Sequence, residues 1–342
     1  MNKGLLEYRA VFILLIFLYH AGVLPIGGTF GVSAFFILSG YCTMLGYRNR
    51  VCQQDFNYST YLKKRLVKYY PLHWLLLLVV LVPDLFSGFT LSNNGLQLAA
   101  NFFLVQSLIP IKEFFFSFNA VSWYLSDTVF FVALAPAVLL LFNKNKWGGV
   151  FLLLALSLLT TILFSLLSEK YIHPIVYINP VVRTADFVFG VWLAYLYETI
   201  EKMRIVSWVK EWCNKLPTLY PLIVLSILYV SVLLYNRIWE LAFFGIIYWL
   251  PCAVILILCS ICSLKEIRLV QSFGSISFEF FMVHQLCMNA LTKMQNAGLF
   301  TIESEYVRVF IDFATATVLA YILHRFFTKP ITAKLQSLIT QY

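Results

Sequence analysis

Charged residues are scarce in this chain. Only 12% of its 342 residues are Asp, Glu, Lys or Arg, whereas an ordinary soluble domain has about 25%. Hydrophobic residues account for 61% of the chain, and the mean hydropathy is +0.82. This composition excludes a water-soluble globular protein and indicates an integral membrane protein.

Nucleic-acid-binding motifs, Gly-rich phosphate loops and low-complexity tails are also missing from the sequence. The formal net charge is +9, which in a soluble chain would suggest nucleic-acid binding. Here the basic residues lie mainly in short loops between apolar runs, where they set the orientation of the chain in the membrane. We therefore expect no nucleic-acid partner.

Cysteines at metal-ligand spacing are missing too. Four of the seven cysteines (Cys42, Cys252, Cys259 and Cys287) lie inside apolar runs, so a disulfide framework of the secreted type is not expected. Cys259 and Cys262 stand one helical turn apart, but no His or further Cys accompanies them at ligand spacing. The sequence favours small apolar core residues at both positions and predicts no metal site.

Long apolar runs fill most of the chain, and a bilayer crossing takes about 20 apolar residues. The runs predict ten helices, near 8–24, 30–47, 69–86, 121–142, 148–168, 182–199, 220–236, 241–262, 270–291 and 307–327. The first run follows Lys3 and Arg9 as a signal peptide would, but many further runs follow it, and we expect it to be retained. A shorter run at 96–111 contains polar residues and Pro110, which favours a re-entrant or interfacial segment on the outer side.

The loop charges give the orientation. With 96–111 excluded as a crossing, 19 of the 25 Lys and Arg residues fall at inner ends and six at outer ends. This positive-inside bias predicts that both termini face the cytoplasm. The predicted fold class is an all-α, polytopic membrane helix bundle of about ten transmembrane helices.

Ionisable side chains inside apolar runs are costly in a membrane and indicate function by default. Those that stand out are Arg9, His20, Asp127, Arg183, Asp186, Glu279, His284 and Asp312. Arg9 and His20 are eleven residues apart, so they share one helix face and lie about 16.5 Å apart along the axis. This spacing suits an extended substrate with an anionic head at the inner surface. The alternative is an orientation charge at Arg9 and a hydrogen-bonded core histidine at His20.

Five of these groups share one depth band in the outer half of the bilayer. They come from four predicted helices: His20, Asp127, Arg183, Asp186 and His284. Such a convergence favours a functional site over unrelated core residues, although Arg183 and Asp186 are one turn apart and can also be read as a structural ion pair.

Basic residues gather on the predicted inner side, where Lys63, Lys64, Arg65 and Lys68 precede Tyr69. Arg65 and Lys68 stand three residues apart on one helix face. This cluster fits phosphate binding, and it equally fits an orientation signal or a contact with anionic lipids.

Six short motifs resemble the acyltransferase 3 family of multi-pass membrane O-acyltransferases. In chain order they are Arg9 with His20, residues 31–40 (GVSAFFILSG), 65–71 (RLVKYYP), 122–127 (SWYLSD), 183–190 (RTADFVFG), and 274–278 (GSISF) followed by His284. Together they run from residue 9 to about 330. Two positions depart from the family pattern: Thr128 stands where many members have a glutamate, with Asp127 before it, and residues 328–330 read Thr-Lys-Pro in place of Glu-x-Pro.

The resemblance implies one integral membrane acyltransferase domain over 1–342, without a separate extracytoplasmic domain, in a bacterial cytoplasmic (inner) membrane. It implies transfer of an acyl group, most often acetyl, from cytoplasmic acyl-CoA to a hydroxyl of a surface polysaccharide or lipid-linked glycan. No metal is implied. On this hypothesis acetyl-CoA is the donor, and the oligomeric state stays open.

The resemblance and the predicted depths together assign roles to the candidate residues. Arg9, Arg65 and Lys68 would bind the donor phosphates, and His20 would act as the general base, with Asp127 orienting its ring. Arg183 and His284 would stabilise the oxyanion or position the sugar. Trp123 and Asp186 would contact the acceptor, and Trp123 can also be read as an ordinary interfacial tryptophan.

Two alternatives remain at this point. The same ionisable residues could line the path of a transporter or flippase for a glycan or a small anion, but no internal inverted repeat is evident. An O-acyltransferase acting on a small hydrophobic molecule would use the same chemistry with another acceptor.

Overall fold

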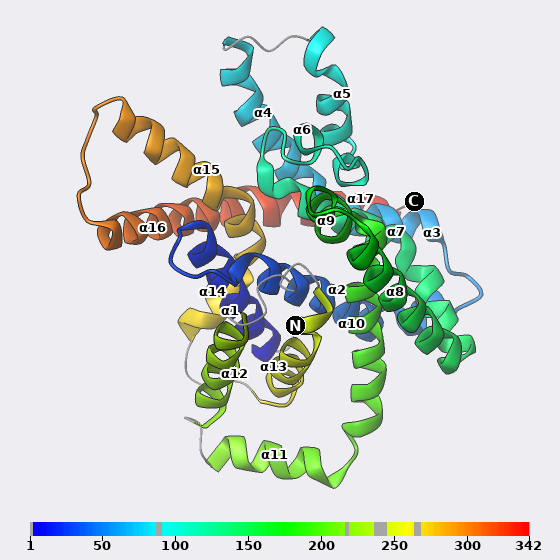
Figure 1. Cartoon of the computed structure of the whole chain (residues 1–342). Coiled ribbons are helices and arrows are strands. Elements are labelled where there is room, and N and C mark those ends of the chain that lie inside the picture. The colour runs from blue at the N-terminus through cyan, green and yellow to red at the C-terminus, as the bar shows by residue number, and fades with distance from the viewer. Residues whose placement is uncertain (1–2, 87–90, 216–218, 236–244, 263–267, 342) are drawn as a thin grey trace. The chain divides into compact units, whose positions relative to one another are not determined.

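The chain is helical throughout the parts that the structure, a computed structural model, describes: residues 3–86, 91–215, 219–235, 245–262 and 268–341 (Figure 1). No strand occurs in these ranges, which confirms the all-α prediction. The longer helices are α1 (Lys3–His20), α2 (Gly27–Val51), α3 (Tyr58–Leu66), α4 (Tyr70–Phe86), α5 (Leu91–Phe102), α7 (Trp123–Lys144), α8 (Lys146–Leu166), α10 (Pro180–Ile200), α11 (Arg204–Lys215), α12 (Leu219–Tyr235), α13 (Trp249–Ile261), α14 (Arg268–Ser275), α15 (Ser277–Asn296), α16 (Glu305–Leu323) and α17 (Lys329–Gln341). Short helical segments include η1 (Gln106–Leu108), α6 (Lys112–Phe115), η2 (Ala120–Ser122), η3 (His173–Ile178) and η6 (His324–Thr328).

Four helical stretches in the described ranges are long and apolar enough to cross a membrane. They are Gly27–Val51, Ala120–Lys144, Trp147–Leu166 and Glu305–Ile339. Two bent helix pairs, α3 with α4 and α11 with α12, raise the number to six if each pair is one span. The count of ten spans and the cytoplasmic termini therefore stay predictions.

Two predicted spans differ from the observed helices. The run 270–291 is broken at Ile276 into α14 and α15. A Cβ on Gly274 would overlap the carbonyl group of Leu6, so α14 lies directly against the backbone of α1 and α15 starts separately. The run 241–262 is helical only from Trp249, and its residues 241–244 lie outside the described ranges.

The segment 96–111 does not form a crossing helix. α5 has 12 residues, about 18 Å of helix, which is too short for a hydrocarbon core of about 30 Å. After α5 the backbone turns at Leu104, whose φ is 53°, and continues in the short segments η1, α6 and η2. The re-entrant or interfacial placement of this segment stays a prediction.

Contacts group the chain into two compact units. The first comprises residues 1–56 and 133–275, and the second comprises 57–132 and 276–342. In the first unit α1 packs against α2, α13 and α14. α2 also packs along α10, and the pairs Ser33 with Arg183 and Arg48 with Glu198 are both 150 residues apart. This constant offset means that α2 and α10 run parallel, as expected for two helices that both run from outside to inside.

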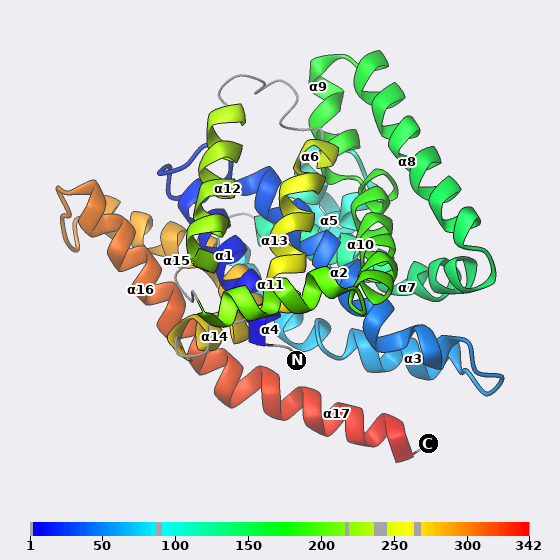
Figure 2. The same ribbon diagram turned by 90° about the horizontal axis from the view of Figure 1, so that it is seen from below.

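In the second unit α15 and α16 form an antiparallel hairpin. Arg308 on α16 holds it together, because its guanidinium donates to Asp312 (2.9 Å), to Gln295 (2.9 Å) and to the carbonyl of Met288 (3.0 Å). α16, η6 and α17 follow one another as a nearly continuous rod, orange to red in Figure 2. α17 packs against α3.

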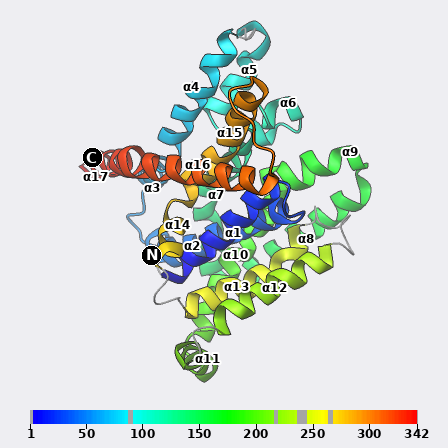
Figure 3. The ribbon, with the colours of Figure 1, turned by 90° about the vertical axis from the view of Figure 1, so that its left-hand side faces the viewer.

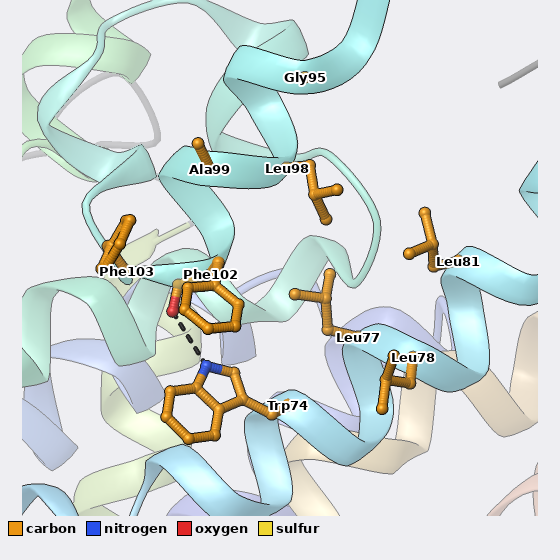
Figure 4. A pocket seen from close by; sticks show the side chains of 9 residues that line it. All are labelled: Trp74, Leu77, Leu78, Leu81, Gly95, Leu98, Ala99, Phe102 and Phe103. Carbon is orange, nitrogen blue, oxygen red and sulfur yellow. Dashed lines mark hydrogen bonds between the residues drawn. The ribbon is translucent and has the colours of Figure 1, made fainter. Parts of the chain in front are cut away.

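α4 and α5 lie side by side in this unit and line an open apolar cavity of about 580 Å³ (Figure 4). The indole of Trp74 points into it, stacks on Phe102 and donates to the Phe102 carbonyl at 3.0 Å. The other lining residues are Leu, Ala, Gly and Phe. Because no titratable side chain lines this cavity, it offers no group for acid–base chemistry.

A disulfide joins Cys213, near the end of α11, to Cys262, just after α13. Figure 3 shows the two helices in the first unit, and they are in contact. Cys259 is buried as expected, but the interpretation of Cys262 as only a small core residue is wrong. The two cysteines are 49 residues apart in sequence, and the packing of α11 on α13 brings them together.

Candidate functional site

The predicted site residues are divided between the two units. Arg9, His20, Arg183 and Asp186 belong to the first, whereas Arg65, Lys68, Trp123, Asp127 and His284 belong to the second. The surroundings of each group are described within its own unit.

Arg9 and His20 lie on the single uninterrupted helix α1, as their spacing predicts. Three residues fill the same face between them, Phe12, Ile13 and Ile16, and none of the three is more than 1% exposed. Arg9 and His20 themselves are half-buried. This face of α1 is therefore enclosed by protein rather than turned toward lipid.

Small residues explain how α1 becomes so closely packed. A side chain on Gly31 of α2 would overlap Ile16. Gly4 of α1 in turn lies against the carbonyl groups of Cys259 and Cys262 at the end of α13. These close approaches fix both the rotation and the height of α1 in its unit.

His20 is the last residue of α1, and its ring makes a hydrogen bond to the backbone of Ile16, one turn earlier. A ring nitrogen that donates to a carbonyl leaves the other nitrogen as an acceptor in the neutral tautomer. The Tyr19 ring lies edge-on to His20, with centroids 5.2 Å apart.

Arg183 and Asp186 form a buried ion pair on α10, with Nη2 and Oδ2 2.8 Å apart and side chains only 3% and 2% exposed. Arg183 also donates to the Ser33 hydroxyl at 2.9 Å and lies over the Phe36 ring. Trp249 at the start of α13 donates to Asp186 at 2.5 Å. The pair thus connects α2, α10 and α13, which is what the structural interpretation of these residues expects. Their role in acceptor binding stays a prediction.

Glu7 is a buried carboxylate that the sequence reasoning missed, because the predicted first span began at residue 8. It is 2% exposed. It accepts from Gln271 of α14 at 2.9 Å and from Tyr220 of α12 at 3.4 Å. Glu7 directly precedes Tyr8 and Arg9 in the sequence. A carboxylate so close to an apolar run could have been added to the candidates.

Trp123, Asp127 and His284 all lie on helices of the second unit, α7 and α15. Trp123 begins α7 and is 6% exposed, and Asp127, one turn later, is fully buried, as is His284 on α15. Asn119 donates to the Met282 carbonyl at 2.9 Å, which ties the chain before α7 to α15. Tyr124 and Phe281 pack edge to face, 4.9 Å between centroids.

His284 has a fixed ring orientation. Its Nδ1 lies 2.7 Å from the Phe281 carbonyl, and its ring stacks on Phe280 with an interplanar angle of 1°. With the proton on Nδ1 donated to this carbonyl, Nε2 is the acceptor. His284, like His20, therefore has one ring nitrogen engaged by a backbone carbonyl one turn earlier.

A network of amides and hydroxyls surrounds the start of α7. The sequence reasoning used Asn101 only as an argument against a crossing at 96–111, and Ser122 only as part of a family motif. Asn101 at the end of α5 is its centre: the amide donates to Ser117 at 2.6 Å and the amide oxygen accepts from Ser122 at 3.3 Å. His73 on α4 contacts the Asn101 carbonyl at 2.8 Å. The network fixes the first turn of α7, from which Trp123 and Asp127 project.

Arg65 and Lys68 flank the bend between α3 and α4. Arg65 is only 8% exposed, and Lys68 is half-buried. Tyr61, one turn before Arg65 on α3, donates to the Val132 carbonyl of α7 at 3.1 Å, so this face of α3 packs against α7. Arg65 therefore faces the interior of its unit, unlike the exposed Lys63.

Glu279 and His324 form a further pair in the second unit, 3.0 Å apart, between α15 and η6. Glu279 was among the candidate ionisable residues and is 2% exposed. His324 was missed because it sits at the end of an apolar run. Asp312, another candidate, is engaged by Arg308 in the α15–α16 hairpin. Within the described ranges no three His, Cys, Asp or Glu side chains gather as metal ligands.

Comparison with known families agrees with the resemblance in the motifs. The model of the acyltransferase 3 family, which describes an acyltransferase domain, matches residues 8–335. No curated protein and no solved structure shows significant similarity to the chain. The family match spans nearly all of the sequence and includes every candidate residue discussed above. The chain therefore belongs to the acyltransferase 3 family of membrane acyltransferases.

Proposed function

We propose that this membrane acyltransferase moves an acetyl or similar acyl group from cytoplasmic acyl-CoA to a hydroxyl of a cell-surface polysaccharide or lipid-linked glycan. The observation that carries the proposal is the placement of Arg9 and His20 on one enclosed face of a single helix. A cation and an imidazole about 16.5 Å apart along the axis suit a donor that is anionic at one end and reactive at the other. The enzyme would work in a bacterial cytoplasmic membrane.

The donor would be held at its phosphates. Arg65 and Lys68 at the bend between α3 and α4 supply charge-assisted hydrogen bonds to phosphate oxygens, and Arg9 would add a third cation. Lys68 binds phosphate as a point charge, whereas the guanidinium of Arg65 can use two donors at once. Because Phe12, Ile13 and Ile16 fill the strip between Arg9 and His20, the pantetheine arm would run beside these side chains.

The transfer itself needs a base, an electrophile and a leaving group. Neutral His20 would take the proton from the acceptor hydroxyl. The oxygen of that hydroxyl would attack the carbonyl carbon of the thioester at the same time. The C–S bond then breaks, the new C–O ester bond remains on the acceptor, and the CoA thiolate takes back the proton. Asp127 would stabilise the imidazolium, while Arg183 or His284 would stabilise the oxyanion or position the sugar.

The acceptor would be recognised by Trp123 and Asp186. An indole ring stacks on the apolar face of a sugar, and a carboxylate accepts from sugar hydroxyls. Trp123 is buried within the second unit and Asp186 within the first.

The decisive experiment replaces the proposed base. In His20→Ala, acyl transfer to surface glycan should fall by roughly 10²-fold or more, while the amount of protein in the membrane and its affinity for CoA stay the same. His173→Ala is the matched control, because His173 is half-buried in η3 and has no proposed role. Near wild-type turnover in His20→Ala would remove His20 from catalysis.

Donor binding is tested separately. Arg65→Ala should raise the KM for acyl-CoA by about tenfold, since one charge-assisted hydrogen bond is worth about 1.5–3 kcal/mol, with kcat at saturating donor little changed. An unchanged KM would mean that the basic cluster only orients the chain. The purified protein is also tested for slow hydrolysis of acetyl-CoA and for thermal stabilisation by CoA. If it shows neither, the result supports the transporter alternative.

A further inference from the structure

Two stretches of the second unit carry positive charge without any negative charge. Residues 56–83 and 313–342 contain no Asp or Glu. Their basic residues are Lys63, Lys64, Arg65, Lys68, Arg325, Lys329 and Lys334. The first stretch contains α3 and most of α4, and the second contains the end of α16, η6 and α17.

Two hydrogen bonds bring these stretches side by side. Thr332 of α17 donates to the Val67 carbonyl at 3.4 Å, and Gln336 donates to the Lys64 carbonyl at 3.2 Å. As the residue number rises along α17 it falls along α3, so the two helices are antiparallel. If this register continues by one turn, Lys329 lies beside the residues that directly follow Val67, the first of which is Lys68.

Helical periodicity decides which lysine of α17 faces this bend. Lys329, Thr332 and Gln336 are spaced i, i+3 and i+7, which puts them on one face. Lys334 lies five residues after Lys329, a rotation of about 140°, and so points away from α3. η6, which immediately precedes Lys329, packs against α4, in agreement with this register.

The arrangement places Lys329 and Lys68 near each other, with Arg65 one turn before Lys68. Like charges at such spacing disfavour the folded state unless an anion compensates them. Glu279 on α15 is 2% exposed and is engaged with His324 of η6. Lys329 is exposed and Lys68 is half-buried, so an anion can approach them from outside.

We propose that Lys329 and Lys68 bind one phosphate group together, and that α17 thereby forms one wall of a phosphate site whose inner side is Arg65. The inference rests on the proposed function insofar as the phosphate belongs to the acyl donor. The chemistry is that of a phosphate monoester or diphosphate. A lipid phosphate is the second possible source, and the experiment separates the two.

The test compares Lys329→Ala with Lys334→Ala, which removes the same charge from the opposite face of the same helix. The full-length protein is placed in nanodiscs of uncharged lipid, and binding of CoA and of inorganic pyrophosphate is measured by calorimetry. Lys329→Ala should raise the Kd for both probes by about tenfold, as expected for a lost charge-assisted hydrogen bond. Lys334→Ala should change it less than twofold, and Lys329→Arg should restore binding. Melting temperatures of the variants confirm that α17 stays docked.

The outcomes separate this inference from the proposed function. If CoA binds and the two alanine variants weaken it equally, the site on α17 is wrong while the proposed donor stands. If the wild type binds pyrophosphate in a Lys329-dependent way but does not bind CoA, the phosphate site stands and the proposed donor is wrong. The binding of pyrophosphate is also measured with phosphatidylglycerol in the nanodisc. If this lipid competes with pyrophosphate in the wild type but not in Lys329→Ala, the site binds a lipid headgroup. Pyrophosphate binding that is the same in wild type and Lys329→Ala overturns the site.

Discussion

The crossing of α2 and α10 allows a prediction of a defined size. A Cβ on Gly40 would overlap the Phe187 carbonyl, because its distance to the carbonyl oxygen would be about 1 Å less than the 3.0 Å that real Cβ atoms keep. A Cβ on Gly190 would likewise overlap the carbonyl of Ile37. Both obstacles are backbone atoms in helices, which cannot rotate aside as a side chain end can. Gly40→Ala must therefore push the two helices apart by roughly 1 Å at this point, as in membrane interfaces built on small residues.

The expected cost follows from two opposing terms. Overpacking of this kind costs about 1–3 kcal/mol, while replacing a helical glycine by alanine returns about 0.5–1 kcal/mol. The separation would also lengthen the 2.9 Å hydrogen bond from Arg183 to Ser33, one to two turns away on the same pair of helices. We expect a net loss of about 1–2 kcal/mol in Gly40→Ala, seen as a lower melting temperature in detergent.

Gly46→Ala on the same helix is the control, because a Cβ there meets nothing within 4 Å. It should be neutral or stabilising by up to about 1 kcal/mol. The double variant Gly40→Ala with Gly190→Ala should cost less than the two single losses added together, since the first substitution already separates the helices. Equal melting temperatures for Gly40→Ala and Gly46→Ala would refute the close backbone approach.

Two further predictions concern the buried polar groups, one in each unit. Asp186→Asn leaves Arg183 as a buried cation without its carboxylate and should cost about 3–5 kcal/mol of stability. Trp249→Phe removes only one hydrogen bond to Asp186 and should cost about 1 kcal/mol. Similar melting temperatures for the two variants would contradict the ion pair. Asn101→Ala removes the side-chain hydrogen bonds of Asn101 to Ser117, to Ser122 and to the Gln97 carbonyl, whereas the backbone carbonyl that His73 contacts remains. The substitution should cost about 2–3 kcal/mol of stability and lower acyl transfer, because the start of α7 is displaced. Its control is Ser157→Ala on α8, whose hydroxyl only bonds back to Leu153 and whose loss should change stability by less than about 0.5 kcal/mol.

Most of the helices could be predicted from the sequence, because apolar runs of membrane length leave the backbone no alternative to a helix. The run 182–199 matches α10 within two residues, and the run 148–168 matches α8 equally well. The break at Ile276 could not be predicted in this way. Two residues before the break, Gly274 lies against the backbone of Leu6, a contact between residues far apart in the chain.

The candidate site shows the same division. The spacing of Arg9 and His20 places them on one helix face whatever surrounds them, and the apolar context marks Asp127 and His284 as unusual. No pattern in the sequence connects Asn101 with Ser122, or Tyr220 with Glu7. These partners are polar residues in loops and at helix ends, and a hydrogen bond between distant segments leaves no periodic trace.

The sequence by itself determined that the chain is a helical membrane protein, which residues share a helix face, and which family motifs it carries, since these follow from composition, local periodicity and short-range order. Only the tertiary structure decided that Arg183 is engaged by both Ser33 and Asp186, that Cys213 meets Cys262, and that α17 lies along α3. Such contacts depend on which helix faces are complementary in shape and charge, and that is fixed only when the helices pack.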